Sequence, residues 1–383
     1  MNSLIITNGK ILVEKEYIDG NLEIINGVIS RIGNFQVDRK ELKVIDANGQ
    51  VIVPGFIDIH THGGNGIDIN HASKEELNKL SKFFASCGVT SFLPTVLTDT
   101  HETMCKLLSE ITDAKEEGTD GSEILGIHME GPFLCVQYKG AMPEYLIQDS
   151  SIENMKDYIN ASKNNIKYMT ISPENKGVEE LVAYLRENNI VASMGHTGAD
   201  YDKCVSCINA GVTSSTHVFN AMGTLHQHRP SAIGAALESD LYSEIICDGF
   251  HLHPGIVRLI IKVKGDEKIL AITDSIMAAG LSDGEYKLGV NDIVVKEGDA
   301  QLASDGTRAG STLTMDRALR NLIKFTGRKL EDVIGFLTKN QADVLSLDNK
   351  GEIAVGKDGD IVILDDKLTP ICTVVKGKVV YER

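Results

Sequence analysis

The sequence contains no apolar run as long as the roughly 18 residues that a membrane-spanning helix needs. Its opening stretch, MNSLIITNGKILVEKEYIDG, also lacks the basic start, the long apolar segment and the small-residue cleavage site of a secretory signal peptide. This stretch has the pattern of a strand and a turn. We therefore expect a cytoplasmic protein that has no membrane as a partner.

Basic charge is scarce as well. Lys and Arg number 38 against 54 Asp and Glu, so the formal net charge is -16. A chain this acidic repels phosphate backbones, and we expect no nucleic acid partner. A small anionic molecule can still bind where cationic side chains or backbone N–H groups form a local pocket.

The cysteines do not form a disulfide framework, because their count of seven is odd and their positions are scattered. Cys204 and Cys207 make a C-x-x-C motif, but the segment around them, DYDKCVSCINAG, has a helical pattern and no second C-x-x-C accompanies it. We expect a structural role for this pair in preference to redox chemistry or metal binding.

Three regions differ in pattern. Short β segments joined by Asn-Gly turns occupy residues 1–53, and short β segments return in residues 351–383. Between them, in residues 54–350, apolar strands alternate with amphipathic helices. We predict two domains: a small β-sandwich domain built from both chain termini (1–53 plus 351–383) and a catalytic domain (54–350).

Eight apolar segments of the central region have a strand pattern followed by a helical one. They are GFIDIHTHG, then residues 90–95, 123–130, 167–174, 190–198, 212–220, 243–251 and 268–275. Eight β-then-α units predict an α/β fold of the TIM type, a (β/α)₈ barrel. Catalytic groups of such barrels come from the carboxyl ends of the strands.

Histidines and carboxylates stand at those strand ends. The candidate metal ligands are His60, His62, Glu130, His196 and His217, and Asp274 ends the last strand. Imidazole nitrogens and carboxylate oxygens suit a divalent metal such as Zn²⁺ or Fe²⁺. The sequence therefore predicts a metal site.

Strand geometry suggests how the ligands group. His60 and His62 alternate along one strand, so both point to the same side and can hold one ion, with Asp274 near it. His196 and His217 stand on adjacent strands and can hold a second ion. One or two ions are therefore expected.

Two carboxylates complete the expected chemistry. Glu130 has two oxygens and can bridge two ions. A metal ion lowers the pKa of bound water towards 7. A carboxylate not fully committed to metal, best Asp274, can take that proton and return it to a leaving group. The chemistry implied is hydrolysis, and His128, two residues before Glu130, is expected to be structural.

Seven segments together are similar to those of a known family. They are PGFIDIHTHG, HMEGPF, MGHTGA, THVFNAM, DGFHLHP, ITDS and AGSTLTM. Over essentially the whole length the chain resembles the amidohydrolase superfamily and, within it, the N-acetylglucosamine-6-phosphate deacetylase family. The resemblance implies metal-dependent release of acetate from N-acetylglucosamine 6-phosphate, giving glucosamine 6-phosphate in amino-sugar catabolism. Deacetylation of N-acetylgalactosamine 6-phosphate or of another N-acetyl hexosamine stays open as an alternative.

The resemblance also implies roles for particular residues. It makes Glu130, His196 and His217 metal ligands and Asp274 the acid/base, and members that keep the H-x-H motif can hold two ions where others hold one. This intact set argues against a binding or regulatory protein that has lost catalysis. The implied contacts to substrate are Ala141, Asn220, Ala221, His228, His251, Arg308 and Ala309.

Two positions depart from the family pattern. Met142 stands where the family usually has a histidine that contacts substrate, and His228 stands where it usually has an arginine, with Arg229 one residue on. Arginine grips phosphate bidentately, whereas histidine binds it more weakly and in a pH-dependent way. Both departures concern the sugar phosphate and not the reaction type. The resemblance further implies a homodimer with the active site near the subunit interface.

Overall fold

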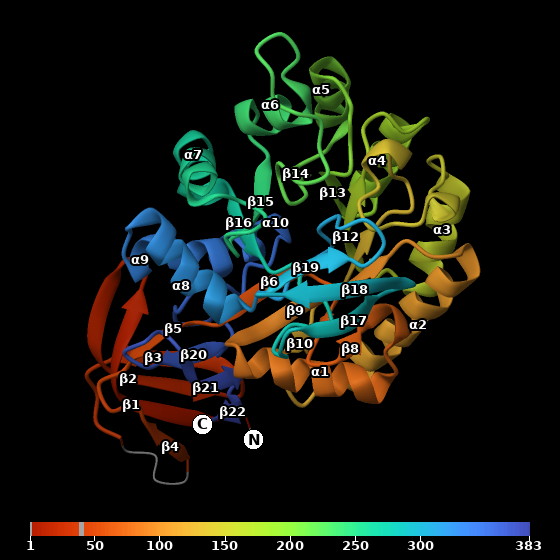
Figure 1. The fold of residues 1–383 in the computed structure, drawn as a ribbon. Helices are drawn as coiled ribbons and strands as arrows, with labels where there is room; N and C mark the ends of the chain where they lie inside the picture. Colours follow the sequence, from red (N-terminus) through yellow and green to blue (C-terminus); the bar gives the residue numbers. More distant parts are fainter. Residues whose placement is uncertain (1, 38–41) are drawn as a thin grey trace.

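The computed structural model describes residues 2–37 and 42–383 (Figure 1). Its centre is a parallel sheet whose strands pair in chain order. They are β6 (Phe56–Thr61), β9 (Val89–Leu97), β11 (Ile127–Glu130), β12 (Ile166–Ile171), β13 (Val191–Met194), β14 (Ser214–Ser215), β15 (Tyr242–Ile246) and β16 (Ile269–Ile272). The Asp274 N–H donates to the carbonyl of His60 at 2.9 Å, so the first and last strands meet. The predicted (β/α)₈ barrel is confirmed.

Helices cover the outside of the barrel. They are α1 (Lys74–Ser86), α2 (His101–Glu117), α3 (Ile152–Ala161), α4 (Val178–Glu187), α5 (Tyr201–Ala210), α6 (Ser231–Glu238), α7 (Pro254–Lys264), α8 (Met315–Thr326), α9 (Leu330–Val333) and α10 (Lys339–Val344). In α1 a capping box of Ser73 and Glu76 begins the helix, and Leu77 and Leu80 are buried. None of the helices in the described part of the chain is long and apolar enough to cross a membrane.

The C-x-x-C pair lies on α5 as two buried free thiols. Burial raises the pKa of the Cys204 thiol to about 12 and that of Cys207 to about 11. Thiols that stay protonated are poor nucleophiles and poor metal ligands. The structure therefore agrees with the structural role expected for this motif.

Most of the predicted strands are shorter than expected, and two of them differ most from their predicted bounds. The segment 123–130 divides into β10 (Glu123–Ile124) and β11, and the segment 212–220 keeps only the two residues of β14. Backbone conformation shortens the strand in the second segment. His217, Phe219 and Ala221 have φ values of 27°, 78° and 49°. Positive φ takes the chain out of the extended conformation and turns it across the barrel mouth.

Both chain ends build a second sheet. Its strands are β1 (Leu4–Val13), β2 (Glu16–Ile25), β3 (Val28–Gly33), β4 (Lys43–Asp46), β5 (Val51–Pro54), β20 (Ile361–Leu364), β21 (Pro370–Val375) and β22 (Lys378–Glu382). Red and dark blue strands lie side by side in Figure 1 because β5 pairs antiparallel with β20. The predicted sandwich is one continuous sheet that branches at β1, which pairs with both β4 and β5. It has its own apolar cluster, which includes Ile11, Leu22 and Ile361.

A third sheet, which the sequence analysis did not predict, crosses the front of the barrel in Figure 1. It consists of β17 (Gly284–Leu288), β18 (Asn291–Lys296) and β19 (Asp299–Leu302). Burial alternates along β18, so Ile293 and Val295 face inward and pack in one cluster with Leu134 and Met142. The remaining short elements are β7 (Gly63–Gly64), β8 (Ile67–Asp68), η1 (Ile69–His71), η2 (Val136–Tyr138), η3 (Glu144–Leu146), η4 (Asp266–Lys268) and η5 (Ile334–Leu337).

A buried lysine joins the terminal sheet to the barrel. Lys350 Nζ lies 2.6 Å from Asp360, 3.1 Å from Asp358 and 2.9 Å from Glu123 of β10. Only 3% of its side chain is exposed. These three carboxylates are close enough together to hold a metal ion, but the ammonium group already contacts all of them. The cluster is therefore an ion-pair network.

The Lys350 network generates a stability prediction. Lys350→Met removes the shared cation and leaves Asp360 buried and unpaired, so we expect a loss of about 3–5 kcal/mol of unfolding free energy. Urea unfolding measures the change. The matched control is Lys378→Met, which removes an exposed lysine 3.5 Å from Asp120 and is expected to cost at most about 1 kcal/mol. Equal stability of the two variants would contradict the network's role.

Candidate metal centre

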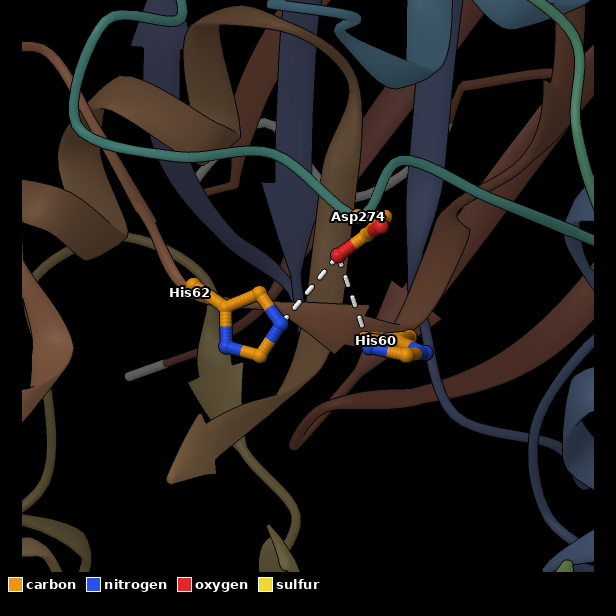
Figure 2. A group of neighbouring side chains, drawn as sticks. All are labelled: His60, His62 and Asp274. Carbon is orange, nitrogen blue, oxygen red and sulfur yellow. Dashed lines mark ion pairs between the residues drawn. The ribbon is translucent and has the colours of Figure 1, made fainter. Parts of the chain in front are cut away.

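Three ligand atoms meet where β6 and β16 end. His60 lies on β6, His62 directly follows it, and Asp274 follows β16 (Figure 2). Asp274 Oδ1 lies 3.1 Å from His62 Nε2 and 3.5 Å from His60 Nε2. All three side chains are buried and close enough together to hold one metal ion.

A second group of three ligand atoms lies beside the first. Glu130, at the end of β11, places Oε1 3.1 Å from His196 Nε2 and 3.2 Å from His217 Nε2. The two Nε2 atoms are themselves 3.1 Å apart. This group, too, is buried and has the spacing of a metal site.

Glu130 also touches the first group. Its Oε2 lies 3.2 Å from His62 Nε2, and its Oε1 lies 3.5 Å from His60 Nε2. One carboxylate therefore stands between four imidazoles. This is the arrangement that a bridging ligand requires, and the grouping predicted from strand geometry is present in the structure.

Hydrogen bonds at Nδ1 set the tautomers of three of these histidines. His62 Nδ1–H donates to the carbonyl of Thr95 at 3.2 Å, and His196 Nδ1–H donates to that of Tyr138 at 2.9 Å. His60 Nδ1–H donates to the carboxylate of Glu244 at 2.9 Å. A neutral imidazole that donates from Nδ1 keeps a lone pair on Nε2, which is the form that binds metal.

The surroundings of the Nε2 atoms show whether the site fits a metal ion. His60 Nε2 is buried and has no hydrogen-bond partner among the described residues. His196 Nε2 and His217 Nε2 face each other at 3.1 Å beside one carboxylate oxygen. Converging lone pairs and carboxylates repel one another unless a cation lies between them. The residues therefore fit a divalent ion bound by nitrogen and oxygen.

Electrostatics in the centre favour a cation. Burial alone would raise the pKa of Glu130, but the neighbouring imidazoles hold it well below its usual range. Burial would lower the pKa of His60, yet the carboxylates of Glu244, Glu130 and Asp274 outweigh it and hold that pKa well above the ordinary value. The ring therefore carries a second proton, on Nε2, until a divalent ion displaces it and frees the lone pair. Glu130 thus stays ionised, and its negative charge attracts a divalent ion.

His128 stands outside both groups. Its Nδ1 lies 3.1 Å from the carbonyl of Ile59, and its Nε2 lies 2.9 Å from the hydroxyl of Thr170. Burial, and then the charge of His60, hold its pKa well below the ordinary value. Both ring nitrogens are engaged, so His128 supports the core as expected and has no nitrogen free for metal.

The backbone turns sharply at three of the site residues. His196, His217 and Asp274 have φ values of 48°, 27° and 49°, which non-glycine residues adopt at a cost of about 1–3 kcal/mol each. Each lies two residues beyond the end of its strand, where the chain leaves the sheet. Gly195 permits one of these turns, because a Cβ there would lie 2.7 Å from Thr216. The strained turns aim the side chains at one another.

A cavity of about 340 Å³ opens above the ligands. Besides His62, Glu130, His196, His217 and Asp274, most of the predicted substrate residues line it: Ala141, Asn220, Ala221, His251, Arg308 and Ala309. Met142 lines it too. The structure therefore brings the predicted metal, catalytic and substrate residues to one place.

His228 is the predicted substrate residue that does not reach this cavity. It is exposed on the loop before α6, where its N–H donates to His226 Nδ1 at 3.2 Å. Within the cavity, His251 Nδ1–H donates to Asp248 at 2.6 Å, and Arg308 forms a bidentate pair with Asp299 at 2.7 and 2.8 Å. Asp248 thereby orients the imidazole of His251, and Asp299 fixes the guanidinium of Arg308 at the wall.

Sequence reasoning missed three contributors. Glu244 bonds to His60, the Tyr138 carbonyl bonds to His196, and Leu288 of the unpredicted sheet lines the cavity. The role of Glu244 could have been suspected from the sequence, because it is an acidic residue within the buried strand YSEII. The Tyr138 carbonyl and Leu288 had none, because their roles depend on how loops fold over the barrel.

Known proteins resemble the chain over nearly its full length. The Amidohydrolase family profile matches residues 51–380. An N-acetylglucosamine-6-phosphate deacetylase of Bacillus subtilis is 37% identical over 99% of this chain and 97% of its own. An N-acetylgalactosamine-6-phosphate deacetylase of Escherichia coli O157:H7 is 32% identical over 94% of each chain.

A solved structure agrees in fold and sequence. A mutant N-acetyl-D-glucosamine-6-phosphate deacetylase from Mycobacterium smegmatis, in complex with N-acetyl-D-glucosamine-6-phosphate, superimposes with a TM-score of 0.91 at 30% identity, covering 99% of both chains. Sequence and structure point the same way. The chain therefore belongs to the metal-dependent amidohydrolase family and, within it, to the N-acetylglucosamine-6-phosphate deacetylase family.

Proposed function

We propose that this chain is a metal-dependent hydrolase that removes acetate from N-acetylglucosamine 6-phosphate and yields glucosamine 6-phosphate in amino-sugar catabolism. The observation that carries the proposal is the carboxylate of Glu130, which stands between four imidazoles beneath a cavity large enough for a hexosamine. The relatives named for this reaction support it.

Each ligand group has a role in the proposal. Glu130, His196 and His217 hold one divalent ion, and His60 and His62, with Asp274 beside them, offer a second site. Zn²⁺ and Fe²⁺ match this mixture of imidazole and carboxylate. Bound there, a divalent ion would supply polarisation of the acetamide carbonyl and a lowered pKa for water.

Asp274 moves the proton in this scheme. It lines the cavity, and its Oδ1 faces His62 and His60, so its carboxylate lies between the first ligand group and the space for substrate. The carboxylate accepts a proton from the attacking water and delivers it to the departing sugar nitrogen. Asn220, Ala221 and His251 on the cavity wall hold the sugar in place.

The exposed loop of His228 bears on assembly. Because His228 does not reach the cavity of its own chain, we propose a homodimer in which this loop completes the phosphate site of the partner. We also propose that residues 1–53 plus 351–383 form one domain and residues 54–350 another, since the terminal segments have an apolar cluster of their own. A phosphorylated substrate does not cross membranes freely, so we propose a cytoplasmic location.

The role of Asp274 is testable by one substitution. Asp274→Asn keeps the shape of the side chain but cannot accept a proton, so we expect kcat for acetate release to fall by about 10²–10⁴-fold. The ion at Glu130, His196 and His217 is expected to remain. Measurement of metal content beside the assay separates the two effects. Asp365→Asn in the terminal sheet is the matched control, and retained activity in Asp274→Asn would refute the assignment.

Metal dependence has its own test. Dialysis against a chelator is expected to abolish acetate release, and added Zn²⁺ or Fe²⁺ is expected to restore it. His196→Ala removes a ligand that sits beside Glu130, so this variant should stay inactive after the same addition. Full activity in chelated protein whose metal content is near zero would contradict the proposal.

Substrate identity is decided by comparing sugars. Because a charge-assisted hydrogen bond contributes about 1.5–3 kcal/mol, loss of the phosphate should lower kcat/KM by on the order of 100-fold. We therefore expect kcat/KM for N-acetylglucosamine 6-phosphate to exceed that for N-acetylglucosamine by this factor. It should also exceed kcat/KM for N-acetylgalactosamine 6-phosphate. A preference for the galactose epimer would assign the chain the activity for which its Escherichia coli relative is named.

A further inference from the structure

We propose that Glu244 is a positioning residue of the metal centre, which holds His60 as a strong ligand of the first group and ties it to His217 of the second. The inference rests on the proposed function only in assuming that ions bind there. It does not depend on which sugar is the substrate.

Glu244 is a buried acid that has no lysine or arginine partner among the described residues. It lies on β15 and is fully buried, between Ser243 and Ile245, which are fully buried too. Among the ion pairs of the described residues, Glu244 takes part in one only, with His60. A carboxylate taken out of water costs several kcal/mol unless charge or hydrogen bonds compensate it. Its retention in the barrel interior therefore calls for a cation nearby.

One oxygen of Glu244 serves both ligand groups. Oε2 accepts from His60 Nδ1–H at 2.9 Å and from the backbone N–H of His217 at 3.0 Å. His60 belongs to the group with His62 and Asp274, whereas His217 belongs to the group with Glu130. The carboxylate thus fixes a side chain in one group and the strained backbone turn that carries a ligand in the other.

The bond to His60 differs from the corresponding bonds of the other ligands. His62 and His196 donate from Nδ1 to neutral backbone carbonyls, but His60 donates to a full negative charge. A carboxylate behind an imidazole fixes the tautomer and raises the basicity of the other nitrogen. That nitrogen, His60 Nε2, is one of the buried atoms that have no hydrogen-bond partner among the described residues. Glu244 therefore strengthens the first site more than the second.

Glu244→Gln separates charge from shape. A glutamine oxygen in the place of Oε2 keeps both hydrogen bonds and loses only the charge. The opposite orientation is disfavoured, because it sets an NH₂ group against two N–H donors. The variant thus isolates what the negative charge contributes to metal binding.

The experiment titrates metal-free protein with Zn²⁺ alone and records the dissociation constant of each ion. For Glu244→Gln we expect the ion bound by His60 and His62 to weaken by about 10- to 100-fold, with a much smaller change for the ion at Glu130. His60→Asn identifies which binding step belongs to the first site. The Tm of metal-free Glu244→Gln is expected to be unchanged or higher, because a buried charge has gone while both hydrogen bonds stay.

Asp360→Asn is the matched control, since it also converts a buried carboxylate to an amide but lies in the Lys350 network. It should lower the Tm and leave zinc affinity unchanged. The proposal is overturned if Glu244→Gln binds zinc as tightly as the unmodified chain, or if both ions weaken equally while the Tm of the metal-free protein falls. Because no sugar is used, failure of the proposed deacetylase activity would leave this test intact.

Discussion

The buried carboxylate of Glu130 is the constraint on which the rest of the centre depends. Its two oxygens lie between 3.1 and 3.5 Å from the Nε2 atoms of four histidines. Those histidines come from the ends of three strands, so the contacts exist only if the barrel closes in the right order and register. A charge buried this deeply is tolerated when other charges satisfy it. The fold and the metal chemistry therefore require each other.

Much of this centre could be predicted, because the direction of a side chain on a strand depends only on neighbouring residues in the sequence. Alternation along β6 places His60 and His62 on one side, and the rule that active groups gather at the carboxyl ends of barrel strands finds Glu130 and Asp274. Glu244 could not be assigned in the same way, since its partner His60 lies 184 residues away in the chain. The position of the sheet β17–β19 could not be predicted either. Its inward side chains pack on loops that the sequence pattern does not place.

The terminal sheet supports the barrel, although it contributes no residue to the candidate metal centre. Pairing of β5 with β20 fixes the segment that leads directly into β6. The strand that carries His60 therefore begins at a fixed position. Lys350 adds a charged tie between this sheet and β10. Asn-Gly turns predicted the strands of residues 1–53, and a similar pattern of short β segments predicted those of residues 351–383. Their pairing needed the folded barrel, which brings residues 53 and 362 together.

Reaction type and substrate choice reside in different parts of the molecule. Each proposed metal ligand, like Asp274, stands on a barrel strand or within two residues of its end. The cavity wall, by contrast, is made by loops that carry Ala141, Met142 and Arg308. A substitution in those loops can reshape the pocket without moving a ligand. This separation agrees with the names of the relatives, which include an N-acetylglucosamine-6-phosphate deacetylase and an N-acetylgalactosamine-6-phosphate deacetylase.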